Sequence, residues 1–145
     1  MSKTVLVTGI SGFIGLYCAK ELLEKGYKVI GTVRNSAKRE EVINTFKKND
    51  INLNNLTFKI LELTSNNGWD KAIQDCEYVM HVASPFRIAN PKNENDMISP
   101  AVEGTRRVLE ASQKAGIKRV VLTSSIVSMM SSIRRGQFGP KDWTD

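Results

Sequence analysis

The sequence predicts an α/β fold in which a doubly wound parallel sheet of about five strands carries helices on both faces. Two observations lead to this prediction. Short runs rich in β-branched residues alternate with longer segments of helical period along the 145 residues, an order typical of parallel sheets with right-handed crossovers. Three glycines, Gly9, Gly12 and Gly15, lie where the first such run passes into the first helical segment.

The individual elements follow from this alternation. Strands are expected at residues 4–8, 27–33, 56–61, 77–83 and 117–123. Helices are expected at about 12–25, from a cap at Ser36 through Phe46, at 69–73, and over a long segment that ends at Gly116. Residues 124–145 show no clear period.

The two longest helical segments carry apolar stripes. In the first, Ile14, Cys18 and Leu22 recur at i, i+4 and i+8, and Gly26 follows where a helix often ends in glycine. In the second, Pro100 is expected to kink the helix or to start its second part. The stripe of this second helix is mostly apolar and consists of Ile98, Val102, Thr105, Leu109 and Ser112.

Composition narrows the class of protein. Hydrophobic residues make up 41% and charged residues 25% of the chain, the balance of one folded domain over residues 1–145. Because no apolar run could cross a bilayer and the N-terminus does not read as a signal peptide, we expect a cytoplasmic protein without a membrane partner. Cys18 and Cys76 are expected to be reduced, and the single histidine argues against a metal site.

The net charge of +6 raises the question of a nucleic-acid partner. The basic residues are scattered along the chain, and the only adjacent arginines are Arg106-Arg107 and Arg134-Arg135. No aromatic residues interleave with these pairs, as they would in a single-stranded nucleic-acid site. We therefore expect no nucleic-acid partner, and only a small bias toward anionic small ligands.

The glycine stretch is expected to bind a pyrophosphate. It lies where the N-terminus of a helix, with its unpaired N–H groups, meets the carboxyl end of a strand. Gly9 would allow the tight turn, Gly12 would let the pyrophosphate approach the backbone, and Gly15 would let the helix pack close to the strand. The spacing is G-x-x-G-x-x-G rather than G-x-G-x-x-G. The alternative is that these are three turn glycines without a ligand.

The end of the second strand favours NADP over NAD. NAD-binding units often place Asp or Glu there to bind the ribose 2′-hydroxyl. This chain has Arg34 instead, followed by Lys38. A guanidinium can hold a 2′-phosphate with two parallel hydrogen bonds, whereas a carboxylate would repel it. The alternative is that Arg34 is a solvated loop cation.

These motifs occur together in one known family. The stretch Thr8-Gly9-x-x-Gly12-x-x-Gly15, Arg34 with Lys38, HVASPF at 81–86 and Thr123-Ser124-Ser125 resemble an extended short-chain dehydrogenase/reductase. The similarity is greatest to the branch of dihydroflavonol reductases, cinnamoyl-CoA reductases and NADPH-dependent aldehyde (methylglyoxal-type) reductases. It covers the whole chain, including the acidic-tryptophan segment at 142–145.

The resemblance implies a Rossmann-like fold and assigns roles to particular residues. The backbone of Phe13 and Ile14 would join the glycine loop in holding the pyrophosphate, and Arg34 and Lys38 would hold the 2′-phosphate. The remaining cofactor contacts would come from Glu62 (where the family more often has Asp) and Leu63 near the adenine, Ala83, Ser84 and Pro85 at the nicotinamide-side ribose, and Thr123 and Ser124.

Ser125 matches the family's catalytic serine, which hydrogen-bonds the substrate carbonyl. The alternative for Thr123-Ser124-Ser125 is a strand end that caps the next turn, and His81 is expected to be structural. Phe86, Ile126 and Met130 are the local candidates to touch a substrate.

The family's reaction is hydride transfer from the nicotinamide to a carbonyl, with a proton from the tyrosine of a Tyr-x-x-x-Lys pair. Tyr17, Tyr27 and Tyr78 all precede Ser125, and none is followed by lysine four residues later.

We therefore expect the N-terminal, cofactor-binding portion of an NADP-dependent carbonyl reductase, ending before the last strands and the substrate domain and inactive alone. The sheet edge beside the fifth strand, which the rest of the family's fold would cover, would then be exposed and favour self-association. A non-catalytic NADP-binding or sensing module, and an NAD-dependent sugar epimerase or dehydratase, remain as alternatives.

Overall fold

The computed structural model describes residues 2–85, 93–130, 136, 139 and 141. The expectations for Phe86, Arg134-Arg135, residues 142–145 and the side chain of Met130 lie outside this description. Strands and helices alternate through the described residues, as the sequence predicts. They are β1 (Thr4–Thr8), α1 (Phe13–Glu24), β2 (Lys28–Val33), α2 (Ser36–Lys48), β3 (Leu56–Ile60), α3 (Trp69–Ile73), β4 (Tyr78–His81), α4 (Asn95–Lys114), β5 (Arg119–Leu122) and α5 (Val127–Met130).

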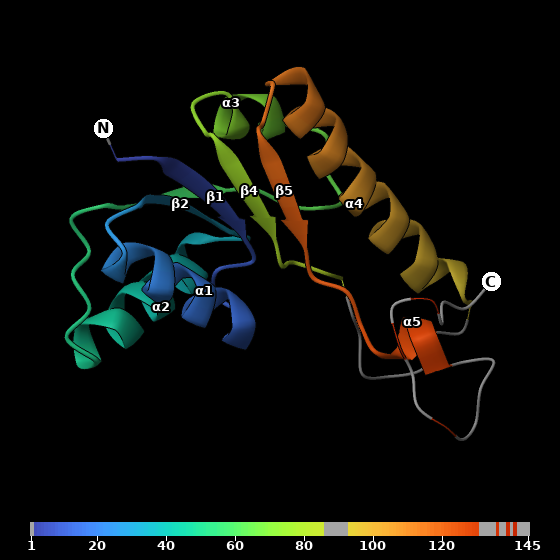
Figure 1. The fold of residues 1–145 in the computed structure, drawn as a ribbon, viewed down its shortest axis with the longest axis horizontal. Coiled ribbons are helices and arrows are strands. Elements are labelled where there is room, and N and C mark those ends of the chain that lie inside the picture. Colours follow the sequence, from blue (N-terminus) through green and yellow to red (C-terminus); the bar gives the residue numbers. More distant parts are fainter. Residues whose placement is uncertain (1, 86–92, 131–135, 137–138, 140, 142–145) are drawn as a thin grey trace.

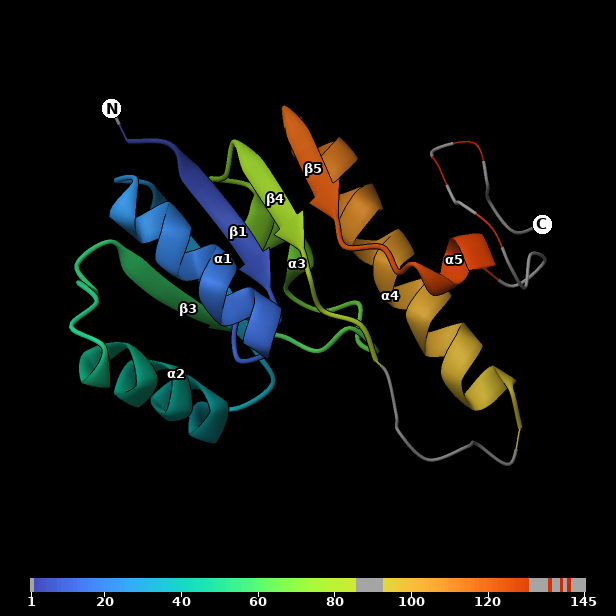
Figure 2. The same ribbon diagram turned by 60° about the horizontal axis from the view of Figure 1, so that its bottom comes forward.

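The strands form a single parallel sheet in the order β3-β2-β1-β4-β5. The chain winds outward from β1 to β3, returns to the centre, and winds the other way through β4 and β5. Helices α1 and α2 cover one face of the sheet, and α3 and α4 cover the other (Figures 1 and 2). The predicted doubly wound sheet is confirmed, and its strand order reverses between β1 and β4, where such folds bind ligands.

Strand β1 supplies core residues to both faces of the sheet. Val5 and Val7 belong to the cluster beneath α1 and α2, and Leu6 belongs to the cluster beneath α3 and α4. All three are at most 2% exposed. Burial of a side chain of this size stabilises the fold by about 1.5–3 kcal/mol relative to its exposure, so the central strand holds both layers together.

The residues that helix α1 buries completely are small. Gly15 and Ala19 are its buried residues. Cys18 and Leu22, expected on the apolar face, are half-buried and pack against the core beside them. Ile14, the third expected member, is 52% exposed.

Helix α4 departs further from the predicted stripe. Its buried residues are Gly104, Val108, Ala111 and Ser112. Of the predicted stripe, Ile98, Val102 and Leu109 are 51%, 57% and 41% exposed. At Gly104 the reason is steric, because a Cβ there would lie 3.1 Å from the Cβ of Leu63 in the loop after β3. Pro100 lies inside this one helix and does not start a second one.

Hydrogen bonds explain two of the element ends that differ from the prediction. The cap of α2 is Asn35 rather than Ser36, and its side-chain oxygen accepts the Lys38 amide at 2.9 Å. Strand β4 ends at His81, two residues early. The amides of Val82 and Ala83 donate to the Thr8 hydroxyl, each at 3.0 Å, instead of continuing the strand.

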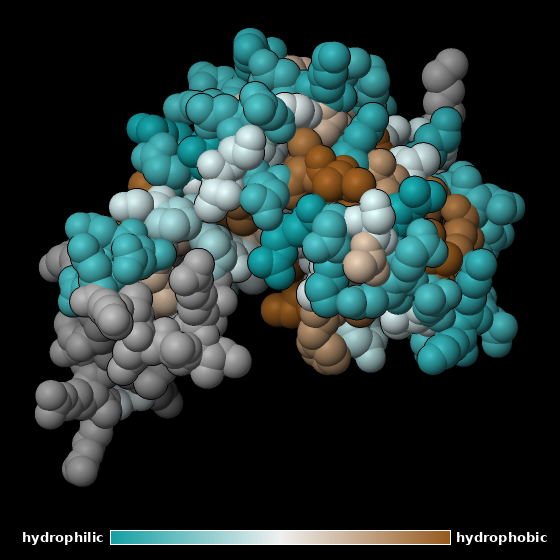
Figure 3. All heavy atoms as spheres, turned by 180° about the vertical axis from the view of Figure 1, so that it is seen from behind, coloured by the Kyte–Doolittle hydropathy of each residue, from teal (hydrophilic) through white to brown (hydrophobic). Residues whose placement is uncertain are grey.

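The surface opposite the view of Figure 1 is mostly hydrophilic, with hydrophobic residues exposed in patches (Figure 3). Cys18 and Cys76 are both free thiols. In the part of the chain that the structure describes, we find no helix with the length and apolar character needed to span a membrane.

Self-association through the sheet edge remains a prediction. Strand β5 is one of the two edge strands of the described sheet, and Val121 and Leu122 on it are each 49% exposed. Because an open apolar edge can pair with another chain, we expect concentration-dependent association in sedimentation velocity. Val121→Lys should reduce it, while Val102→Lys on the outer face of α4 should not. A single monomeric species at high protein concentration would contradict the prediction.

Candidate functional site

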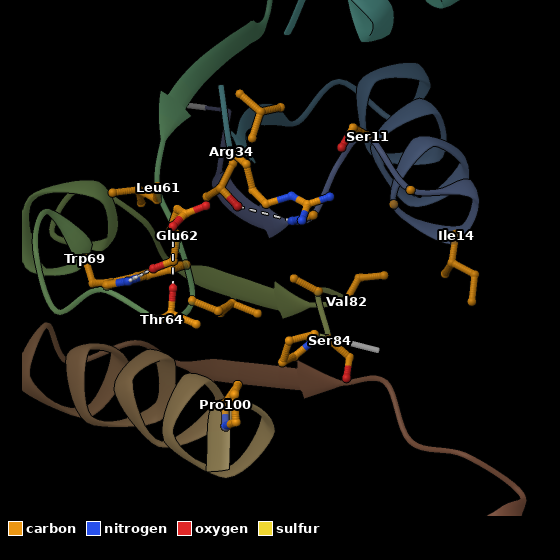
Figure 4. A pocket seen from close by; sticks show the side chains of 18 of the residues that line it. Ser11, Ile14, Arg34, Leu61, Glu62, Thr64, Trp69, Val82, Ser84 and Pro100 are labelled. Carbon is orange, nitrogen blue, oxygen red and sulfur yellow. Dashed lines mark hydrogen bonds between the residues drawn. The ribbon is translucent and has the colours of Figure 1, made fainter. Parts of the chain in front are cut away.

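A cavity of about 720 Å³ lies at the carboxyl ends of the strands. Its walls come from the turn after β1, the end of β2, the loop after β3, the segment after β4 and the first part of α4. Arg34 lies between Ser11 on the glycine turn and Glu62 after β3, with Ser84 and Pro100 across the cavity (Figure 4). The cavity therefore occupies the point where the strand order reverses.

Most residues that the sequence identifies as cofactor-binding line this cavity. They are Gly9, Gly12, Phe13, Ile14, Gly15, Arg34, Glu62, Leu63, Ala83, Ser84 and Pro85. Thr8, Lys38, Thr123, Ser124 and Ser125 are not among the lining residues. The sequence analysis gave no role in the site to the remaining lining residues, which are Ser11, Thr32, Val33, Leu61, Thr64, Trp69, Val82, Asp96 and Pro100.

The turn after β1 requires glycine at position 9 for two reasons. Gly9 has a φ of +66°, in the left-handed region that residues with a Cβ disfavour. A Cβ at this position would also lie 2.9 Å from the Cβ of Ala83. The Gly9 amide donates to the Thr32 hydroxyl at 3.1 Å, and the Ile10 amide donates to the Thr32 carbonyl at 3.2 Å. Strand β2 therefore fixes the turn from one side while Ala83 approaches it from the other.

Gly12 and Gly15 serve different purposes. A Cβ at Gly15 would overlap the Gly9 carbonyl oxygen, so glycine lets α1 pack against the turn itself rather than against the strand. A Cβ at Gly12 would meet only the Gly9 carbonyl oxygen, at an ordinary contact distance of 3.4 Å. Gly12 also has an unstrained φ of −81°. The fold itself has room for a side chain at position 12, so the packing of the turn does not require glycine there.

The N-terminus of α1 is open to an anion. Within the described residues, its cap Gly12 offers no side-chain hydrogen bond, and the first turn holds no acidic residue. Helix α2, by comparison, is capped by Asn35. Because the first amides of a helix need partners and lie at the positive end of its dipole, the start of α1 suits a phosphate group.

Thr8 is fully buried and acts behind the cavity wall. Its hydroxyl oxygen accepts the amides of Val82 and Ala83 and lies 2.8 Å from Nδ1 of His81. Since both lone pairs of the oxygen are used, its hydrogen is donated to Nδ1, and the imidazole proton lies on Nε2. Thr8 thus positions the segment 82–83 from outside the lining of the cavity, and His81 has the structural role expected from the sequence.

The His81 ring is neutral at physiological pH. It is 1% exposed, and burial lowers the pKa of its imidazole below the ordinary value of 6.5. Among the described residues, no acceptor pairs with Nε2. Protonation would also remove the Nδ1 acceptor that Thr8 needs, so the network at the end of β4 depends on the neutral ring.

Arg34 is the cation that faces the cavity. It follows β2 directly, is exposed, and forms no ion pair with a carboxylate in the described part of the chain. Lys38, one turn into α2, is turned to Glu41, with 2.7 Å between its ammonium nitrogen and the carboxylate. Of the two predicted phosphate ligands, Arg34 is therefore the one available without rearrangement.

The Thr123-Ser124-Ser125 segment follows β5. The Thr123 amide still donates to the His81 carbonyl at 3.0 Å, which extends the strand pairing. Ser125 is exposed, and its hydroxyl accepts the Val127 amide at 3.3 Å at the start of α5. This contact is the turn-capping role that the sequence left open. Among the described residues, no three His, Cys, Asp or Glu side chains gather as a metal site would require.

Comparisons with known proteins agree with this geometry. The model of the NAD dependent epimerase/dehydratase family matches residues 5–138. Among curated proteins, the anthocyanidin reductase of Vitis vinifera is 36% identical over 147 residues, covering 99% of this chain and 43% of that protein. The chain spans about two fifths of the length of the first curated relatives that it matches, from 38% to 43%.

Two solved structures show the same fold. Gre2 of Candida albicans in complex with NADPH is 34% identical with a TM-score of 0.83, over 99% of this chain and 44% of that chain. The yeast methylglyoxal/isovaleraldehyde reductase Gre2 complexed with NADPH is 29% identical with a TM-score of 0.82, over 97% of this chain and 43% of that chain. The resemblance to reductases of this kind, indicated by the sequence motifs, is confirmed.

The two turn glycines should respond differently to alanine. Gly9→Ala should lower the free energy of unfolding by about 2 kcal/mol or more, because it adds backbone strain and a clash with Ala83. Gly12→Ala should cost less than about 1 kcal/mol but weaken NADPH binding at least about tenfold. Denaturant unfolding and fluorescence titration measure the two quantities. Normal NADPH affinity in Gly12→Ala would argue that no ligand lies against that backbone.

The buried His81 should make the fold sensitive to mild acid. Because its pKa is lower in the folded than in the unfolded chain, its contribution to stability is complete above about pH 6.5 and is lost as the pH falls toward the folded-state pKa. Thermal unfolding between about pH 7.5 and 5.5 should show a falling midpoint. The slope should be shallower in His81→Asn, and an identical slope in both proteins would show that another group is responsible.

Proposed function

The chain belongs to the NAD dependent epimerase/dehydratase family, and we propose that it is the NADPH-binding portion of a reductase that acts on carbonyl groups. The chain spans about two fifths of its curated relatives, 39% in one case, so the complete reaction also draws on the remainder of such a protein. The relatives solved with NADPH support the choice of cofactor.

Arg34 carries this proposal. It lines the cavity at the end of β2, where a carboxylate would favour NAD. Its guanidinium presents a rigid fork of donors that matches the oxygens of a 2′-phosphate. Lys38 lies one turn further along α2 and would add a second positive charge after release from Glu41.

The other walls of the cavity suit the remaining parts of NADPH. The backbone at Gly12 and the uncapped start of α1 would hold the pyrophosphate. Glu62 and Leu63 would border the adenine, and Ala83 to Pro85 would border the nicotinamide-side ribose. When bound, the cofactor supplies the hydride. The residues of this chain would bind it and orient its two ends.

Ser125 is proposed to position the substrate carbonyl. It follows β5, at the same edge of the sheet as the cavity, and it is exposed. Its oxygen accepts the Val127 amide, which leaves the hydroxyl hydrogen to be donated to a carbonyl oxygen. This donor favours a reductase over a module that only senses NADP, because a sensor has no carbonyl to hold.

Replacement of Arg34 should change the preference between the two nicotinamide cofactors. Arg34→Ala should weaken NADPH binding by about ten- to a hundredfold, since a charge-assisted contact is worth roughly 1.5–3 kcal/mol. NADH binding should hardly change, because NADH lacks the 2′-phosphate. Fluorescence titrations of both cofactors with wild type, Arg34→Ala and the control Arg106→Ala measure the effect.

Two outcomes would count against the proposal. Equal loss of NADPH and NADH affinity in Arg34→Ala would mean that Arg34 shapes the cavity rather than reading the phosphate. Tighter binding of NADH than of NADPH by the wild-type chain would favour an NAD-dependent epimerase or dehydratase instead.

A further inference from the structure

The adjacent arginines of α4 have different surroundings. Arg106 points outward, where it pairs with Glu103 and Glu110 of the same helix, and its side chain is 60% exposed. Arg107 points toward the loop between β3 and α3. Its Nη1 donates to the Leu63 carbonyl, and its Nε donates to the side-chain oxygen of Asn66. One member of the pair is therefore a surface residue, and the other connects two segments of the fold.

The loop that Arg107 holds is also held from α3. The indole N–H of Trp69, a residue that is 3% exposed, is shared between the carbonyls of Glu62 at 3.3 Å and Ser65 at 3.0 Å. Arg107 of α4 donates to the carbonyl of residue 63, and Trp69 of α3 donates to the carbonyls of residues 62 and 65. The loop is thus fixed by the two helices beneath it.

Helix α4 approaches this loop closely. A Cβ at Gly104 would lie 3.1 Å from the Cβ of Leu63, which is tighter than nearly all such contacts. Gly104 is one turn before Arg107 on the buried side of the helix. The small residue brings the α4 backbone to the loop, and the guanidinium then reaches the Leu63 carbonyl. Residues 61–64 of the same loop line the cavity.

We propose that Arg107 is a positioning residue that fixes the adenine-side wall of the cavity through the Leu63 carbonyl and the Asn66 side chain. The inference rests on the proposed NADPH site and assigns a role within it to a residue outside the cavity lining. The planar guanidinium suits this role, because two of its nitrogens serve two acceptors at once, which a lysine ammonium on a flexible stem does less well.

A pair of matched variants tests the proposal. Arg107→Met keeps an unbranched apolar stem and removes both contacts, and Arg106→Met is the control in the neighbouring position. We expect Arg107→Met to weaken binding of NADPH, and equally of adenosine 2′,5′-bisphosphate, by roughly tenfold, because a partly buried carbonyl loses its donor. Arg106→Met should stay within about twofold of wild type, since exposed ion pairs contribute little.

A second measurement separates positioning from a general loss of stability. Asn66→Ala removes one acceptor of Arg107, so its effect on NADPH binding should not add to that of Arg107→Met in a double-mutant cycle, whereas it should add to that of Arg106→Met. Amide hydrogen exchange of residues 62–66 should be faster in Arg107→Met than in Arg106→Met, with the sheet amides unchanged.

The outcomes distinguish the inference from the proposed function. Suppose that the wild-type chain binds NADPH and that Arg107→Met and Arg106→Met bind it equally tightly. This result would overturn the role of Arg107 and leave the proposed NADPH site unchanged. A wild-type chain that binds neither NADPH nor the bisphosphate would overturn both. Additive effects of Arg107→Met and Asn66→Ala would also count against the proposed contact.

Discussion

The hydroxyl of Thr8 is the interaction on which the cavity depends. It joins the two central strands at the edge where their order reverses, accepting the amides of Val82 and Ala83 and donating to His81. These contacts end β4 and bring Ala83 against the turn after β1. The closeness of Ala83 in turn restricts position 9 to glycine. A single buried polar network therefore shapes the turn, the end of the strand and the cavity wall between them, and its members are costly to leave unpaired.

Features that depend on local sequence could be predicted. The order of strands and helices follows from the periodicity, and the turn glycines and Arg34 mark the cavity because they lie at fixed positions after strands. The end of β4 could not be predicted, because it depends on a partner far along the chain. Strand β4 stops at His81 only because Thr8 takes the next two amides, and nothing near residue 82 in the sequence shows this.

The buried faces of the helices were harder to predict for a physical reason. Hydropathy identifies large apolar side chains, but α1 and α4 approach their neighbours closely through Gly15, Ala19 and Gly104. The large residues are then displaced to the flanks or to the outer surface. The contacts that hold the loop after β3 were also not predictable from the sequence. The sequence showed Arg106-Arg107 only as a basic pair, because the two partners of Arg107 lie 41 and 44 residues earlier in the chain.

The distance along the chain between the cavity walls bears on how the protein folds. Thr8 and His81 are 73 residues apart, so β1 and β4 meet only after a long loop has closed, a step that is slow in chains with many non-local pairings. The wall formed by Ala83 does not exist before this step. A dinucleotide bound as proposed would therefore meet a complete cavity only in a nearly finished fold. Its binding would slow unfolding rather than speed folding.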